Sequence, residues 1–85
     1  MSETVRCWLV EREADQRDLL TLTYATPDGE RAFTRRGSLE TLQRRGGVSA
    51  AKEIQTEDLK PVNDPDRRER YATEVERMRE RHNPD

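Results

Sequence analysis

The sequence predicts an α+β fold, in which an antiparallel meander of three to four strands carries a C-terminal amphipathic helix on one face. Three observations predict it. Apolar residues cluster in strand-like runs in the first part of the chain, a Thr-Pro-Asp-Gly turn at residues 26–29 joins two of these runs, and apolar residues recur at helical spacing near the C-terminus. The 85 residues suffice for one small domain, 1–85, with ends at 1–3 and 83–85 that we expect to fray.

The first strand spans residues 4–11, and its apolar side chains fall on both faces. Alternation puts one set, Val5, Cys7 and Leu9, opposite a second set, Arg6, Trp8 and Val10. Apolar groups on both faces are typical of a strand inside a sheet, or of one whose second face is covered. The polar residues 11–18 then predict the loop of a wide hairpin.

The second and third strands, residues 19–25 and 30–36, flank the turn. Proline fixes φ at the first turn position, aspartate bonds its own backbone, and glycine accepts a positive φ. The more apolar face of the second strand consists of Leu20, Leu22 and Tyr24. The opposite face suits solvent or a light cover and consists of Leu19, Thr21, Thr23 and Ala25.

Residues 38–45 predict a short helix after the third strand, because Ser38 is a good N-cap and the paired Gly46 and Gly47 would end it. Residues 48–62 are compatible with two structures. One is a short edge strand at 50–55 followed by a helical turn, and the other is a loop; in both, Leu59 and Val62 anchor the segment in the core.

The last helix spans residues 65–82, with Asp64 as its N-cap and Pro65 at its first position. The spacing of its apolar side chains predicts one buried stripe, formed by Tyr71, Val75, Met78 and His82. We expect the meander to cover this stripe, with Leu20, Leu22 and Tyr24 as the floor.

Catalysis and metal binding are not expected, and neither is a cofactor. The chain has one cysteine, Cys7, and one histidine, His82, which is too few for a structural zinc site. Its serines lie near no recognisable nucleophile motif, and Gly46-Gly47 lacks the spacing of a phosphate-binding loop. Paired carboxylates need a desolvating cleft, which we do not expect such a thin core to form. The sequence therefore predicts that the protein is not an enzyme.

The local excess of positive charge suggests a contact surface. Within residues 31–45 the cationic residues are Arg31, Arg35, Arg36, Arg44 and Arg45, against Glu40 alone. Side by side they would hold phosphates, with Phe33 or Trp8 stacking on a base. Alternatively, acidic residues of the last helix neutralise them. Trp8 either packs beneath a helix or, if exposed, is a candidate partner contact together with Phe33.

The composition also bears on the compartment. A formal net charge of −2 argues against a general polyanion-binding surface. A lone cysteine excludes an intramolecular disulfide, no apolar run reaches the ~18 residues of a membrane span, and the N-terminus lacks a signal-peptide core. These features predict a soluble, cytoplasmic protein without a membrane contact.

Three segments resemble a family of small uncharacterised haloarchaeal proteins. They read WLVERE at 8–13, LLTLTYATPDGER at 19–31 and LKPVNDPDRRERYATEVERMRERHNPD at 59–85. The resemblance implies a cytoplasm at molar salt and carries no known function. The net charge of −2 is less acidic than is usual for proteins of such cells.

Together these features favour a non-enzymatic interaction or accessory module, with a protein partner or a second copy of the chain. The alternative is a nucleic-acid-associated protein that uses the arginine cluster. A small enzyme subunit would need a deep pocket holding two carboxylates or His82.

Overall fold

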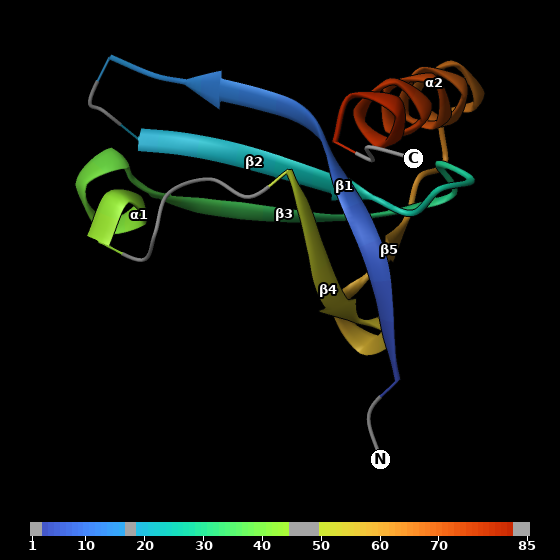
Figure 1. Cartoon of the computed structure of the whole chain (residues 1–85), viewed down its shortest axis with the longest axis horizontal. Helices are drawn as coiled ribbons and strands as arrows, with labels where there is room; N and C mark the ends of the chain where they lie inside the picture. Colours follow the sequence, from blue (N-terminus) through green and yellow to red (C-terminus); the bar gives the residue numbers. More distant parts are fainter. Residues whose placement is uncertain (1–2, 17–18, 45–49, 83–85) are drawn as a thin grey trace.

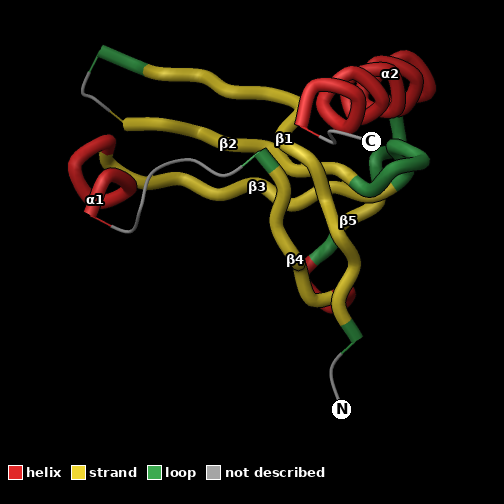
Figure 2. The backbone as a smooth tube through the Cα atoms, in the orientation of Figure 1, coloured by secondary structure: helices red, strands yellow, loops and turns green. Residues whose placement is uncertain are grey.

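The computed structural model describes residues 3–16, 19–44 and 50–82 and has the predicted α+β architecture (Figure 1). The elements follow in the order β1 (Thr4–Ala14), β2 (Leu19–Ala25), β3 (Arg31–Ser38), α1 (Leu39–Arg44), β4 (Ala51–Gln55), the 3₁₀ helix η1 (Thr56–Asp58), β5 (Lys60–Pro61) and α2 (Pro65–His82). In the tube view of Figure 2, α2 lies at one end of the sheet and α1 at the opposite end of β3.

Within the described residues, the sheet is antiparallel and has five strands in the order β4-β1-β2-β3-β5. The prediction of three to four strands is therefore wrong in number. β1 and β2 form the predicted antiparallel hairpin, but the wide loop expected at 11–18 is wrong, because residues 11–14 belong to β1 and pair with β2. The edge strand expected near residues 50–55 is β4. The strand that the sequence does not reveal is β5, because its two residues are too few to show alternation.

The sheet is curled, because its two outermost strands are joined by a short connection. β4 and β5 lie at opposite edges, and only η1 and Leu59 separate them along the chain. A flat sheet would hold these edges about 19 Å apart, which is four strand spacings. Curling brings Ile54 and Leu59 into one cluster with Leu22 of the central strand. We call the side of the sheet that holds this cluster the inner face.

The core consists of two clusters, one on each face of the sheet. The inner-face cluster contains Cys7, Leu20, Leu22, Tyr24, Ile54 and Leu59. The opposite face, which we call the helix face, joins the sheet to α2 through Trp8, Ala25, Tyr71 and Val75. Met78 and Val62 pack against this second cluster.

The prediction of which sheet residues pack beneath α2 is therefore wrong. The helix stripe lies on Trp8 and Ala25, not on Leu20, Leu22 and Tyr24. The curled sheet already covers those three side chains with its own Ile54 and Leu59. The face that was expected to be solvated or lightly covered includes Thr23 and Ala25, which are 7% and 0% exposed.

A β-bulge in β1 positions α2. The register of β1 against β2 shifts between Leu9 and Glu11, so that Glu11 pairs with Thr23 on the helix face. There the Tyr71 hydroxyl donates a hydrogen bond to Glu11 Oε2 over 3.1 Å, and Arg70 lies 3.4 Å from Glu11 Oε1. Burial and the hydrogen bond to Glu11 raise the pKa of Tyr71. One carboxylate thus satisfies the hydroxyl of a side chain that is only 4% exposed.

The turn between β2 and β3 packs directly on α2. Gly29 has a φ of +73°, and a Cβ at this position would lie 2.3 Å from the carbonyl oxygen of Arg68. The turn is held by Asp28, whose Oδ1 accepts hydrogen bonds from the Thr26 hydroxyl and from the Glu30 N–H at 2.9 Å. These bonds lower the pKa of Asp28. Glycine is required here both for its φ and for the contact with the helix.

The two helices begin at side-chain caps. At α2, Asp64 Oδ1 accepts a hydrogen bond from the Asp66 N–H over 3.1 Å, and Pro65 occupies the first helical position. At α1, Ser38 Oγ accepts a hydrogen bond from the Thr41 N–H over 3.1 Å. The expected end of this helix at Gly46-Gly47 lies outside the described residues. Of the ends expected to fray, 1–3 and 83–85, only residue 3 is described.

Candidate functional site

The outer edge of β3 is the part of the sheet where backbone polar groups lack a neighbouring strand. The backbone N–H and C=O of Arg31 point toward the β2 side. The carbonyl accepts a hydrogen bond from the Thr26 N–H over 3.0 Å, and the N–H donates one to Thr26 Oγ1 over 3.2 Å. On the other side, the Glu30 carbonyl accepts the Val62 N–H over 2.8 Å. Because these directions alternate along a strand, Thr34 and Arg36 direct their N–H and C=O groups away from β2.

β5 covers only the beginning of this edge. It pairs with Arg31 and Ala32, and the described chain then leaves β3 through η1. Beyond Ala32, β2 is the only strand of the described residues that pairs with β3. The outward groups of Thr34 and Arg36 are therefore available to a further strand. We call this stretch, residues 33–36, the open edge.

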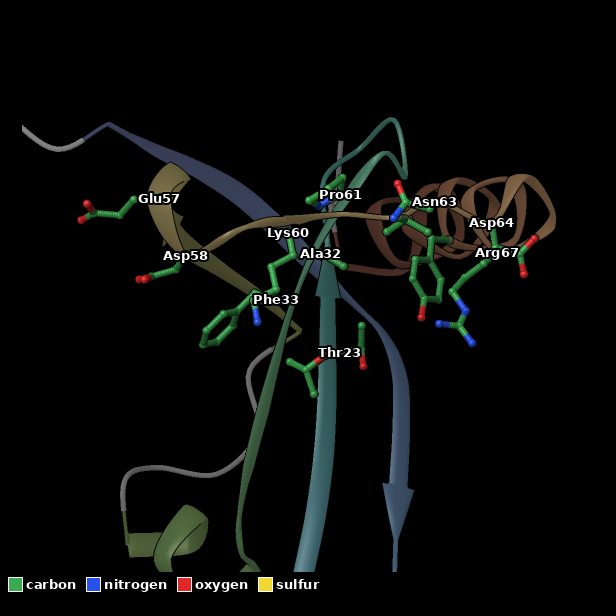
Figure 3. A pocket seen from close by; sticks show the side chains of 13 residues that line it. Thr23, Ala32, Phe33, Glu57, Asp58, Lys60, Pro61, Asn63, Asp64 and Arg67 are labelled. Atoms are coloured by element: carbon green, nitrogen blue, oxygen red, sulfur yellow. The ribbon is translucent and has the colours of Figure 1, made fainter.

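A groove of about 710 Å³ adjoins the open edge on the helix face (Figure 3). Its lining includes Thr23, Thr34 and Ala32 from the sheet, Tyr71 and Arg67 from α2, and Lys60 from β5. In Figure 3, Lys60 extends from β5 toward Phe33, and Arg67 extends from α2 on the other side of Thr23. Neither cation forms an ion pair within 4.0 Å among the described residues. We call this groove the helix-face groove.

Three acidic residues also line the helix-face groove, but they lie at its ends. Figure 3 shows Glu57 and Asp58 beyond Phe33, on the side of η1. Asp64 lies at the beginning of α2, where its carboxylate accepts a helix N–H. The middle of the groove, around Thr23, therefore lies between two cations.

A second, smaller groove of about 370 Å³ adjoins the open edge on the inner face. It separates Phe33 and Arg35 of β3 from Ile54 and its neighbours in β4, with Asp58 at its boundary. We call it the inner groove. Phe33 and Asp58 border both grooves, which shows that the two grooves meet at the same part of β3.

The structure distributes the predicted arginine cluster over several surfaces. Arg35 pairs with Leu22 and so lies on the inner face, whereas Arg36 pairs with Thr21 and lies on the helix face. Arg31 is exposed at the start of β3, and Arg44 is exposed on α1, where it pairs with Glu40 over 3.1 Å. Arg45 lies outside the described residues. The structure thus brings Arg35 and Arg36 to one edge without uniting the cluster on one face.

The two predicted partner contacts have different environments. Trp8 is 9% exposed and packs with Tyr71 and Val75 beneath α2, so its ring is part of the core. Phe33 is half-buried, pairs with Tyr24 and borders both grooves. Of the two, Phe33 is the aromatic residue that a molecule at the open edge would contact.

Cys7, the one cysteine in the sequence, lies in the inner-face cluster. Burial raises the pKa of the Cys7 thiol to about 11, which keeps this thiol protonated near neutral pH. The described residues include no group of three or more histidine, cysteine or carboxylate side chains that could hold a metal ion. What the open edge offers is backbone hydrogen-bonding groups, an aromatic ring and cations.

Sequence reasoning did not identify Lys60, Arg67, Thr23 and Thr34 as parts of a site. Lys60 and Arg67 are isolated charges in a chain that is 40% charged, so no pattern distinguishes them. Thr23 and Thr34 lie in the predicted second and third strands, and their direct pairing could have been obtained from the hairpin register. The adjacency of η1, β5 and α2 depends on the curl of the sheet.

Within the described ranges, no helix has both the length and the apolar character needed to cross a membrane. No curated protein and no solved structure matches this chain. A family model described as a family of unknown function matches residues 1–85. The chain belongs to that family, DUF7967.

Proposed function

We propose that the protein is a non-enzymatic interaction module that binds an extended segment of another protein as an additional strand on the open edge of β3. The observation that carries this proposal is the outward direction of the Thr34 and Arg36 backbone groups between two grooves. In strand addition, main-chain hydrogen bonds provide affinity and alternate side-chain pockets provide specificity. The open edge offers both features, since a groove adjoins each of its faces.

The directions of the β3 side chains favour a protein over a nucleic acid as the partner. The nucleic-acid alternative requires Arg31, Arg35, Arg36, Arg44 and Arg45 to form one surface, and the two strand positions nearest to each other, 35 and 36, face opposite ways. We expect no electrophoretic shift of RNA or DNA by the wild-type protein at about 50–100 mM salt, where phosphate contacts dominate binding. A shift that is lost when Arg35 and Arg36 are replaced by glutamine would support the alternative.

A cytoplasmic setting is part of the proposal. It is supported by the single, buried Cys7 and by the resemblance to haloarchaeal proteins.

An extended partner segment has its side chains on both sides of the new strand, so Phe33 on the inner face and Thr34 on the helix face would both take part.

The decisive test compares Thr34→Pro with Thr34→Val. Proline removes the outward N–H of Thr34 and leaves the bonds of its neighbours to β2, whereas valine keeps the N–H. Each tagged protein would be used to capture partners from native cells after nuclease treatment, with identification by mass spectrometry. We expect partners that bind the wild type and Thr34→Val to be lost with Thr34→Pro. Their retention by a folded Thr34→Pro protein would exclude strand addition at this edge.

A further inference from the structure

The charges around the open edge indicate what kind of segment binds there, an inference that rests on the proposed strand addition. We propose that the partner is an acidic extended segment, with a carboxylate opposite Thr34 that lies between Lys60 and Arg67. The residues next to this carboxylate point into the inner groove and are apolar.

The pairing geometry determines which groove each side chain of the segment enters. Directly paired residues of neighbouring strands share a face, as Thr23 and Thr34 do. A residue opposite Thr34 therefore enters the helix-face groove, and a residue opposite Phe33 or Arg35 enters the inner groove. The bound strand would continue the line of β5, whose Lys60 pairs with Ala32.

The helix-face groove suits an anionic side chain. Lys60 and Arg67 extend from two of its walls without an ion-pair partner among the described residues, and Figure 3 shows Thr23 between them. Thr34 also lines this groove. Thr23 is only 7% exposed, so a carboxylate beside it would be partly desolvated. Charge-assisted hydrogen bonds in such surroundings are stronger than those in open solvent.

The inner groove suits apolar side chains better. Phe33 and Ile54 line it from opposite strands, and Phe33 packs against the inner-face core cluster. The charged residues that border this groove are Arg35, Lys52, Glu53 and Asp58, so positive and negative charges are balanced there. An alternation of acidic and apolar residues would match both grooves at once.

A second copy of the chain fits the open edge less well than an acidic segment does. If two copies paired in antiparallel register through their outward backbone groups, with Thr34 of each copy opposite Arg36 of the other, Arg35 of one copy would lie opposite Arg35 of the other. Like charges directly opposite each other in a sheet are destabilising. Among the described residues, Arg35 has no ion-pair partner within 4.0 Å that would offset this repulsion.

The test uses blocked synthetic peptides as probes. One alternates glutamate with valine, a second replaces every glutamate with lysine, and a third has the first composition with a central proline. Binding to the isotope-labelled wild-type protein would be followed by NMR, through the backbone amide signals of Thr34 and Arg36. We expect the glutamate peptide to bind at these amides and the lysine and proline peptides to bind about tenfold more weakly or not at all.

Variants of the groove provide the matched comparison. Lys60→Gln combined with Arg67→Gln should lower the affinity for the glutamate peptide about tenfold, because both substitutions keep a polar side chain and remove its charge. Arg79→Gln, at an exposed position of α2 outside the groove lining, is the control and should leave binding unchanged.

The outcomes separate the two proposals. Equal binding of the glutamate and lysine peptides, with both lost in Thr34→Pro, would overturn the acidic partner and leave strand addition in place. If the glutamate peptide binds the Lys60 and Arg67 variant more weakly but binds Thr34→Pro as tightly as the wild type, strand addition would be overturned. No binding of any peptide at the Thr34 and Arg36 amides would overturn both.

Discussion

The two ends of β3 differ in how their polar groups are satisfied. At its beginning, Ala32 pairs with β2 and Arg31 bonds to Thr26 on one side, both residues pair with β5 on the other, and the preceding turn packs on α2. Farther along, β2 is the one described strand that pairs with residues 33–36, which lie between two grooves. One strand is thus paired on both sides at its closed beginning, whereas at its open edge it has outward backbone groups that no described strand pairs with.

The difference follows from the curl of the sheet. The chain crosses from β4 to β5 through η1, which lets β5 reach only the first two residues of β3. A longer β5 would have closed the open edge and removed the grooves. The same connection also delivers Ile54 and Leu59 to the core, so the open edge is a consequence of how the inner face is covered.

The largest effect should separate two neighbouring positions of β3. Phe33→Pro removes an N–H directed toward β2 and a half-buried ring, and we expect it to lower the free energy of unfolding by about 4 kcal/mol. Thr34→Pro removes an outward N–H, and we expect a loss of about 1 kcal/mol or less. Urea unfolding monitored by circular dichroism would measure both. Similar losses for the two variants would mean that the N–H groups of Phe33 and Thr34 are both hydrogen-bonded in the folded protein.

The turn that precedes the closed beginning of β3 should lose stability when a single methyl group is added. Gly29→Ala places a Cβ against the Arg68 carbonyl at a positive φ, and we expect a loss of about 3 kcal/mol in the free energy of unfolding. Glu30→Ala, an exposed position of the same turn, is the control and should stay within about 0.5 kcal/mol of the wild type. A Gly29→Ala protein as stable as its control would show that the turn does not pack on α2.

A smaller effect should appear where α2 meets β1. Tyr71→Phe keeps the ring and removes the hydroxyl that donates to Glu11, and we expect a loss of about 1 kcal/mol. A double-mutant cycle with Glu11→Gln would isolate the coupling between the two side chains. Additive losses would indicate that the hydroxyl and the carboxylate are not hydrogen-bonded in solution.

The smallest effect should appear only in acid. The folded-state pKa of Asp28 is lowered, so its contribution to stability is fully present above the unfolded-state pKa of about 4 and is lost as the pH falls through the folded-state value. The stability difference between the wild type and Asp28→Asn should therefore shrink as the pH falls below about 4. A difference that stays constant with pH would argue against the ionised hydrogen-bonded turn.

The sequence predicts the parts of this fold that depend on local chemistry. Pro27, Asp28 and Gly29 determine the turn, and the spacing of Tyr71, Val75 and Met78 indicates the buried side of α2. It does not predict which face of the sheet α2 covers, because both faces of β1 are apolar. That choice depends on η1 and on the bulge at Val10, and both are tertiary features.

The candidate site was less predictable than the fold. Phe33, Arg35 and Arg36 could be selected from composition, and all three lie on the open edge. The edge itself results from where β5 ends, and two residues cannot reveal that boundary by alternation. Lys60 and Arg67 become neighbours of the edge only when β5 and α2 are placed beside β3.

Amide hydrogen exchange along β3 tests the open edge most directly. If the outer side of β3 is unpaired beyond Ala32, the amides of Phe33 and Arg35 should be protected by β2, whereas those of Thr34 and Arg36 should exchange much faster. Addition of the glutamate peptide should then slow the exchange of Thr34 and Arg36 selectively. Equal protection of all four amides in the free protein would contradict the account, because it would show that the edge is already paired.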